Sequence, residues 1–394
     1  MRFSRRFASW NLEANQLTEA LAARKSAGAE VLDLTESNPT RAGLAYPEEA
    51  IRAAMGHAGA MRYRPDPLGL RAAREAVSNY YSSRGVVVEP ERVVLTASSS
   101  EAYGWLFKLL CNPGDEVACP RPSYPLFEYL AGLEFIRLIH YECSESGGRW
   151  TIDTDSIRLA AGPRTRAIIA VHPNNPTGHC VSCPERDWLA GFAGAREIPL
   201  IVDEVFQDFV YREDSASQPS FAAEREILTF TLNGLSKTAA LPQLKLGWIV
   251  VSGPAALAEA ALNRLELIAD TYLSVSTPVQ LAAETLLTEV APRMRRQILD
   301  RAGKNLRTLE RTLAATSRFR LLTPEGGWSV LVETPFAVDE AFCLDLLETT
   351  GVLLHPSEFF GFAEPRYAVL SLLTPPPVFE EGVTRMATHM TSHH

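Results

Sequence analysis

The chain has 394 residues, of which 46% are hydrophobic and 22% are charged, and its formal net charge is −9. This length allows a large buried core in two or three domains, and the composition is ordinary for a soluble globular protein. The negative charge and the absence of a long basic run argue against nucleic acid or an anionic membrane as a partner. No apolar stretch approaches the roughly 20 residues that span a bilayer.

The N-terminus and the cysteines bear on the compartment. Residues 1–7 are basic, but polar residues follow where a signal peptide has its apolar core, so we expect a cytoplasmic protein. Six scattered cysteines fit that compartment as buried apolar side chains. Only Cys180 and Cys183 have the spacing of a metal or redox site. No second Cys or His pair completes four ligands, so we expect no metal.

The first part of the chain combines helical patterns with turn-rich loops that are suited to face a partner. The Pro/Gly loop at 63–69 leads into one of the helices. The pattern predicts a strand at 31–34 and helices at 12–30, 51–55 and 70–81.

From about residue 92, short apolar runs alternate with helical stretches at 100–110, 126–131 and 185–195. This alternation predicts an α/β fold with a mostly parallel, seven-stranded type of sheet sandwiched by helices. Functional loops are then expected at the carboxyl ends of the strands. The predicted strands are 93–96, 116–119, 135–139, 167–171, 200–203, 227–232 and 246–251.

The last part of the chain has a different character. A long helical region covers about 254–315, with breaks expected at Pro278 and Pro292. A strand-rich mixture follows, with strands at 319–322, 328–332, 352–354 and 368–372 and a helix at 339–349. We therefore predict a large domain at 46–289 and a smaller α/β domain at 290–394, joined by the N-terminal segment 1–45.

Lys237 is the residue around which the functional prediction is built. It follows the apolar run 227–232, so it is held at the end of a short buried strand. An amine that attacks a carbonyl needs a pKa lowered by burial or by nearby positive charge, and Lys245 follows eight residues later. Most lysines are simply exposed. Motifs at other strand ends nevertheless favour a lysine that forms a Schiff base.

Two strand ends offer groups for a phosphate and for a planar ring. Ser99 and Ser100 open a predicted helix, where hydroxyls and unpaired backbone N–H groups bind a phosphate well. The same serine-rich stretch is equally suited to cap the helix. Tyr124 follows the next strand, where its ring can stack on a planar cofactor or can pack as an ordinary half-buried tyrosine.

Two further strand ends carry polar groups that suit a pyridine ring. Asn175 precedes Pro176, and a cis bond there would fix the amide to donate to a phenolate oxygen; a simple Asn-Pro turn is the alternative. Asp203 ends a strand, and a carboxylate there can hold a pyridine nitrogen protonated, so that the ring acts as an electron sink. Capping of the next helix is the alternative role, and Glu204 is the competing carboxylate.

These motifs occur together in one order. The run Asn-Asn-Pro-Thr-Gly at 174–178 is followed by Asp-Glu-Val-Phe at 203–206 and by Ser-Lys at 236–237, with a cation and Leu-Gly at 245–247. In this respect the chain resembles, over nearly its whole length, the fold-type I pyridoxal-phosphate enzymes of the class I/II aminotransferase family.

The resemblance implies a homodimer with shared sites and a role for each residue. Lys237 would form the Schiff base with pyridoxal 5'-phosphate and move the proton between the substrate α-carbon and the cofactor. The implied cofactor contacts are Tyr63, which reaches the phosphate in the neighbouring subunit, Ser99, Ser100 and Lys245 at the phosphate, Tyr124 stacked on the ring, Asn175 at the ring hydroxyl and Asp203 at the pyridine nitrogen.

The chain departs from the family at three cofactor positions. Phe206 stands where a tyrosine is usual, so one hydrogen bond to the ring oxygen is missing and a higher pKa of the Schiff base is expected. Lys245 replaces an arginine and offers a point charge in place of a bidentate fork. Gly234 replaces the usual serine or threonine.

The largest departure concerns the substrate. Val369 aligns with the arginine that binds the substrate α-carboxylate in the family. Either Arg41 or Arg366 takes over, or the substrate is not an ordinary α-amino acid. We favour Arg41 slightly, because the family's corresponding N-terminal loop covers the substrate, and Asn38 of the same loop is a further candidate. For both arginines, a solvent-facing position is the alternative.

Three functions follow from this. The first is a homodimeric aminotransferase that moves an amino group from an amino acid to a 2-keto acid. The second is a pyridoxal-phosphate lyase or synthase acting on an unusual amino acid, because the same carbanion serves several reactions. The third is a non-catalytic cofactor-binding protein, since a fold shared with enzymes does not prove chemistry.

Overall fold

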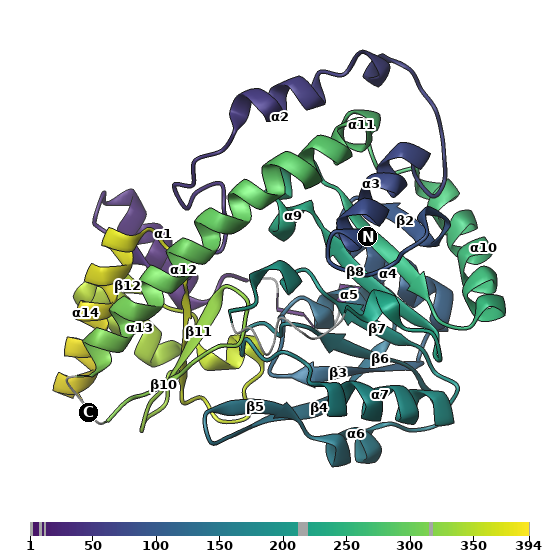
Figure 1. The fold of residues 1–394 in the computed structure, drawn as a ribbon. Helices are drawn as coiled ribbons and strands as arrows, with labels where there is room; N and C mark the ends of the chain where they lie inside the picture. Colours follow the sequence, from purple (N-terminus) through teal and green to yellow (C-terminus); the bar gives the residue numbers. More distant parts are fainter. Residues whose placement is uncertain (1–2, 8–9, 12, 212–219, 315–317, 394) are drawn as a thin grey trace.

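The computed structural model describes residues 3–7, 10–11, 13–211, 220–314 and 318–393. Its centre is an eight-stranded sheet with the strand order β2-β9-β8-β7-β6-β3-β4-β5 (Figure 1). The strands from β8 to β4 are parallel, whereas β9 and β5 pair antiparallel with their neighbours. The predicted α/β class with a mostly parallel sheet is therefore confirmed. The strands are β2 Val93–Thr96, β3 Glu116–Arg121, β4 Arg137–Ser146, β5 Arg149–Ile152, β6 Thr165–Val171, β7 Leu200–Asp203, β8 Thr229–Gly234 and β9 Gly247–Ser252.

The eighth strand, β5, corrects the seven-stranded expectation. Gly147 and Gly148 take positive φ angles of 62° and 87° and turn β4 back into β5. Only glycine adopts such angles without strain, and a Gly-Gly pair between two short strands is a hairpin signal. The sequence analysis passed over this signal.

Helices cover both faces of the large sheet. Because side chains alternate along a strand, Ile168 and Ala170 of β6 pack against α6 and α7, whereas Ile169 and Val171 pack on the face that carries α4, α5 and α10. This burial on both sides explains the continuous apolar runs of the parallel strands. The helices on the two faces are α4 Ser99–Leu110, α5 Phe127–Leu133, α6 Thr154–Ala160, α7 Cys183–Ala195 and α10 Ala255–Tyr272, and at the β2–β9 end α3 Arg71–Ser82 and α11 Thr277–Thr285.

The long helical region breaks at one proline and not at the other. α10 ends before Pro278, as predicted. Pro292 does not interrupt the helix. α11 continues through a π-helical turn, Leu286–Val290, directly into α12, Ala291–Leu313 (Figure 1). Within this turn Ala291 N–H bonds to Leu286 O. The wider turn accommodates the missing N–H and the ring of the proline.

A smaller structure packs beside the large sheet. β10 Arg320–Leu322, β11 Ser329–Glu333 and β13 Tyr367–Ser371 form an antiparallel sheet, and β1 Leu32–Asp33 pairs in parallel with β12 Val352–Leu353. Side chains of the N-terminal segment thus share a core with C-terminal elements. The domain limits at 45 and 289 stay a prediction. The helices of this part, together with α2, are α1 Gln16–Ser26, α2 Glu48–Met55, α13 Glu340–Thr350 and α14 Pro376–His393.

The predicted helix at 12–30 is shorter in the structure, where it is α1, and its first position lies outside the described residues. The helices α6 and α14 were not predicted. None of the described helices is both long and apolar enough to cross a membrane.

Candidate active site

Lys237 lies in α9, Leu235–Thr238, a single helical turn that begins where β8 ends. Its Nζ lies 4.8 Å from the ring centroid of Trp328 and 5.5 Å from that of Phe206. Burial against these rings lowers the pKa of Lys237 to about 8, although the charge of Asp203 opposes this shift. A larger fraction of this amine is therefore neutral and nucleophilic near neutral pH than of an ordinary lysine.

Gly234, the residue before α9, has a steric reason to be glycine. A Cβ at this position would lie 2.9 Å from the Cα of Gly247 and 2.9 Å from the carbonyl oxygen of Leu246. The two strands β8 and β9 approach closely here, so the serine or threonine of the family does not fit without a shift of backbone.

Asp203 is the last residue of β7 and is almost fully buried. Its carboxylate accepts hydrogen bonds from the hydroxyl of Tyr103 and from the backbone N–H of Val205, both at 3.1 Å. Burial raises the pKa of Asp203 to about 6, while the two hydrogen bonds and Lys237 act in the opposite direction. Two buried groups whose pKa values are displaced in one place mark a candidate functional site.

One cavity of about 440 Å³ brings the central predicted residues together. It is lined by Lys237, Asp203, Asn175, Tyr124 and Ser99. The bond between Asn175 and the following proline is cis, and the Asn175 side-chain oxygen accepts a hydrogen bond of 3.2 Å from a serine hydroxyl of β11. The volume is in the range of small-molecule sites.

The other wall of this cavity was not predicted from the sequence. That wall comes from β11, β13 and the loop after β12, and these segments show no chemical motif in the sequence. The only sequence signal for His355 was its place directly after the predicted strand 352–354. The missed lining residues include Ser236, Trp328, Ser329, His355, Phe359, Phe360 and Ser371.

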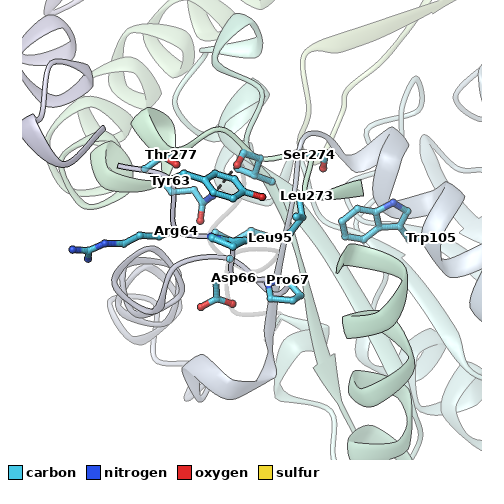
Figure 2. A pocket seen from close by; sticks show the side chains of 13 residues that line it. Tyr63, Arg64, Asp66, Pro67, Leu95, Trp105, Leu273, Ser274 and Thr277 are labelled. Carbon is cyan, nitrogen blue, oxygen red and sulfur yellow. Dashed lines mark hydrogen bonds between the residues drawn. The ribbon is translucent and has the colours of Figure 1, made fainter. Parts of the chain in front are cut away.

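Several predicted residues do not line the cavity of the single chain. Ser100 lies in the first turn of α4, beside Ser99. Lys245 is exposed, with a φ of 56°. Tyr63 is 79% exposed and lines a small separate pocket with Trp105 and Leu273 (Figure 2). The roles of these three residues stay predictions.

The three substrate candidates also lie outside the cavity lining. Asn38 is exposed, and its side chain accepts hydrogen bonds from the following threonine. The side chain of Arg41 is 69% exposed and lies 3.7 Å from Glu36. That of Arg366 is 47% exposed and lies 3.4 Å from a glutamate of β11. Val369, at the aligned arginine position, does line the cavity.

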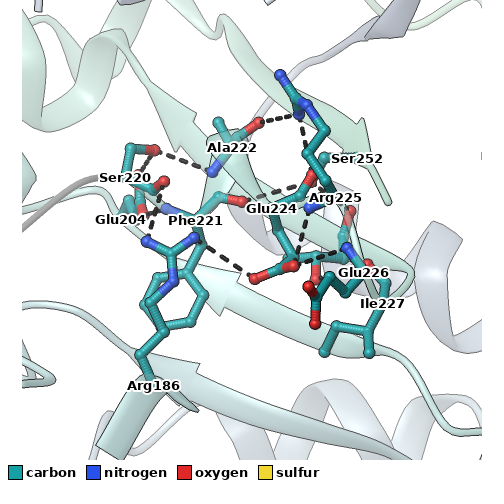
Figure 3. Close-up of polar contacts among 11 residues, drawn as sticks. Arg186, Glu204, Ser220, Phe221, Ala222, Glu224, Arg225, Glu226, Ile227 and Ser252 are labelled. Carbon is teal, nitrogen blue, oxygen red and sulfur yellow. Dashed lines mark hydrogen bonds and ion pairs between the residues drawn. The ribbon is translucent and has the colours of Figure 1, made fainter. Parts of the chain in front are cut away.

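Glu204, the competing carboxylate, has a different environment. It accepts hydrogen bonds from the Ser220 hydroxyl at 2.6 Å and from the Phe221 backbone N–H at 2.7 Å (Figure 3). Burial raises the pKa of Glu204 to about 7. Glu204 is not among the residues that line the cavity, so Asp203 is the carboxylate available to a ligand there.

No group of three or more His, Cys, Asp or Glu side chains is placed to hold a metal ion in the part of the chain that the structure describes. The site combines a half-buried amine, Lys237, and a buried carboxylate, Asp203, at the carboxyl edge of a parallel sheet. This arrangement suits an enzyme that holds a carbonyl cofactor covalently.

Comparison with known proteins gives the family. The model of aminotransferase classes I and II matches residues 29–374, and the chain belongs to this family. Among solved structures, an aminotransferase from Escherichia coli and an alanine aminotransferase from Pyrococcus furiosus each superpose with a TM-score of 0.89 at 25% identity. The first match covers 100% of this chain and 99% of the other, and the second covers 100% of both.

Two relatives show how far the sequence similarity reaches. The glutamate-pyruvate aminotransferase AlaA of Escherichia coli K12 is 33% identical over 262 residues, which are 66% of this chain and 64% of that protein. The match thus spans somewhat less than two thirds of this relative's length. The arginine-pyruvate transaminase AruH of Pseudomonas aeruginosa is 31% identical over 391 residues, which are 96% of this chain and 94% of that protein.

Proposed function

We propose that this chain is an aminotransferase that moves an amino group from an amino acid to a 2-keto acid, with pyridoxal 5'-phosphate bound covalently to Lys237. The observation that carries the proposal is the placement of Lys237, with its pKa lowered to about 8, in one cavity with the buried Asp203. The two relatives named above act with pyruvate according to their names, which supports a keto-acid acceptor.

The groups in and beside the cavity fit this cofactor. Asp203 offers a buried carboxylate to a pyridine nitrogen, Asn175 offers an amide to the ring hydroxyl, and Tyr124 offers a ring. Ser99 stands at the N-terminal end of α4, where backbone N–H groups and the helix dipole favour a phosphate. Lys245, Ser100 and the partner subunit's copy of Tyr63 would complete the phosphate contacts.

The chain's own residues would perform the proton transfers. When bound, pyridoxal phosphate supplies an electron-withdrawing ring that stabilises negative charge at the substrate α-carbon. Lys237 Nζ would take the proton from that carbon and pass it to the cofactor. A pKa near the working pH suits both the uptake and the release of the proton. The rings of Phe206 and Trp328 lie beside Nζ and give it an apolar surrounding on that side.

We further propose a cytoplasmic homodimer that shares its active sites. Large apolar side chains are exposed near Tyr63 in the chain and on α10, and exposed apolar surface is a common mark of an interface. Met61 is 91% exposed, and Leu267 and Tyr272 of α10 are also exposed. Sedimentation of the cofactor-loaded protein should show a dimer. Tyr63→Ala should weaken binding of pyridoxal phosphate and leave the fold of the large sheet unchanged.

The experiment that tests the function is chemical. The purified protein is incubated with pyridoxal phosphate, reduced with borohydride and mapped by mass spectrometry, and keto-acid formation from a pool of amino acids is assayed with pyruvate. We expect a label on Lys237 and a keto product that forms in step with amination of pyruvate. Lys237→Ala should lose both, whereas the exposed Lys304→Ala of α12 should keep both.

Two results would contradict the proposal. A label that is absent from Lys237 in the wild-type protein would remove the site assignment. A label on Lys237 together with cleavage of the amino acid, in the absence of any acceptor, would favour the lyase or synthase activity.

A further inference from the structure

An amino acid or a keto acid brings a carboxylate into the cavity, and a buried anion needs a cation or hydrogen-bond donors. Among the described residues that line the cavity, only Lys237 and His355 have side chains that can carry a positive charge. Lys237 is committed to the cofactor under the proposed function. Arg41 and Arg366 lie outside the lining and are paired with glutamates.

His355 lies directly opposite Val369, the residue predicted to align with the family's arginine. It forms an antiparallel β-bridge with Val369 of β13. Residues that lie directly opposite each other in an antiparallel pair present their side chains on the same face, and both of these line the cavity. His355 therefore stands beside the position that carries the arginine in the family.

The same face leads from His355 to the cofactor residues. Ser371 lies two residues beyond Val369, so its side chain shares the face. Ser329 of β11 is the direct partner of Ser371, and its hydroxyl donates to Asn175. One continuous wall thus joins His355 to Asn175.

The ring of His355 is held in place by aromatic neighbours. It stacks on Phe359 with centroids 4.6 Å apart and planes at 18°, and it meets Phe360 edge-on at 6.2 Å. Burial lowers the pKa of His355, and the charge of Asp33 opposes this only in part. Burial thus favours the neutral imidazole, which has one N–H to donate.

We propose that His355 recognises the carboxylate of the amino-acid and keto-acid substrates in place of an arginine. This role rests on the proposed aminotransferase function. The ring donates its N–H to one carboxylate oxygen, and the apolar side chain of Val369 beside it leaves room for the ring. His355 is thus the residue that sets the preference for carboxylate substrates over simple amines.

Binding of propanoate to the cofactor-loaded protein tests this role without turnover. Propanoate has the carboxylate but no amino or keto group, and ligand-observed NMR titration measures weak dissociation constants. In His355→Ala we expect the dissociation constant to rise about 10- to 100-fold, as for a lost hydrogen bond to a charged group. In His355→Gln, which keeps an N–H donor, the rise should be smaller. His140→Ala, an exposed histidine of β4, should bind propanoate like the wild type.

Kinetics provide the second measurement. KM for the amino acid should rise in His355→Ala by about the same factor as the propanoate dissociation constant, while kcat stays within about threefold. The melting temperature and the cofactor absorbance of each variant show that it is folded and loaded.

The outcomes separate the two proposals. Unchanged propanoate binding in His355→Ala would overturn the role of His355, and so would a tenfold loss in Arg41→Ala that His355→Ala does not share. Weakened propanoate binding in His355→Ala, with no transamination by the wild type, would confirm the carboxylate site and overturn the proposed function.

Discussion

The two walls of the cavity differ in how they relate to the family. On the wall formed by the large sheet, Lys237, Asp203 and Asn175 stand at strand ends, as the sequence motifs predict. On the wall formed by the smaller sheet, His355 stands opposite Val369, the residue predicted to align with the family's arginine. We infer that this chain keeps the cofactor half of the site and has changed the substrate half.

The difference has a structural origin. Lys237, Asp203 and Asn175 each lie at or within a few residues of the end of their own strand, so a short motif fixes both their identity and their place. The substrate wall is assembled from the loop after β12, from β11 and from β13, which meet only in the folded chain. Specificity can therefore change through single substitutions while the cofactor chemistry is retained.

The strongest test of the conserved half is Asp203→Asn. Under the proposed function, loss of the buried carboxylate would remove the charge that holds the pyridine nitrogen protonated, and we expect kcat to fall by about 10²–10³-fold, as for other preorganised electrostatic groups. Glu204→Gln is the matched control, because Glu204 bonds to Ser220 and Phe221 outside the cavity. A similar loss of kcat in both variants would contradict the assignment of Asp203.

The cofactor-free form of Asp203→Asn should be more stable than the wild type at pH 7. Burial raises the folded-state pKa of Asp203 from its ordinary value of 3.8 to about 6. The charged carboxylate therefore lowers the stability of the fold increasingly as the pH rises from 3.8 through 6. The neutral amide avoids this cost, which is about 3 kcal/mol at most. Urea unfolding of the two cofactor-free proteins measures the difference, and a less stable variant would contradict the argument.

A second prediction concerns the seam between the two halves. His179, in the loop of Asn175, is buried, and its ring nitrogens lie 3.2 Å from Glu185 of α7 and 3.5 Å from Glu325 beside β11. The N–H groups of Glu325 and Gly326 donate to Gly178 O. This cluster therefore ties the Asn175 loop to the substrate wall.

His179→Ala should destabilise the protein by about 3 kcal/mol, because it leaves the carboxylate of Glu185 without its cation and leaves Glu325 with Arg149 alone. Burial alone would lower the pKa of His179, but the contacts with Glu185 and Glu325 raise it to about 9. A pKa raised from 6.5 contributes stability that is complete below pH 6.5 and is lost as the pH rises through 9. The wild type should show this decline in urea unfolding, and His179→Ala should not.

The pH dependence at the acid end has the opposite sign. The folded-state pKa of both glutamates is lowered to about 2, against the effect of their burial, so their contribution is complete above pH 4.5 and is lost as the pH falls through 2. If His179→Ala still loses stability as the pH rises through 9, a group other than His179 causes that loss.

The sequence predicted the cofactor wall better than the rest. Lys237, Asp203 and Asn175 line one cavity because strand ends of a parallel sheet meet along one edge, and their roles toward a cofactor stay predictions. The hydrogen bond from Tyr103 to Asp203 spans 100 residues and leaves no local pattern. His355 was missed for the same reason, since its partner Val369 is defined by strand pairing.

Two errors had local causes. The hairpin at Gly147 and Gly148 has a recognisable turn signal, which was not used. Pro292 was taken as a helix break, but the π-helical turn before it absorbs the missing N–H. The first could have been predicted from the residues, whereas the second depends on how the long helix packs.

The smallest expected effect tests Phe206, one of the three positions on the cofactor side where the chain departs from the family. Phe206 is buried beside Lys237, with its ring 5.4 Å from that of Trp328. Phe206→Tyr would add a hydroxyl that donates to the ring oxygen of the cofactor and favours the deprotonated form of its linkage to Lys237. We expect the pKa of that linkage to fall by about one unit, or about 1.4 kcal/mol, in a visible absorbance titration.

Phe359→Tyr is the matched control for this prediction, because Phe359 lies on the substrate wall and stacks on His355. The same hydroxyl placed there should leave the pKa of the linkage unchanged. An equal fall in the pKa of the linkage in both variants would mean that a hydroxyl on either wall affects the linkage to the same extent. A shift in Phe206→Tyr alone would show that the cofactor half can be tuned without touching substrate recognition, as the division of the cavity requires.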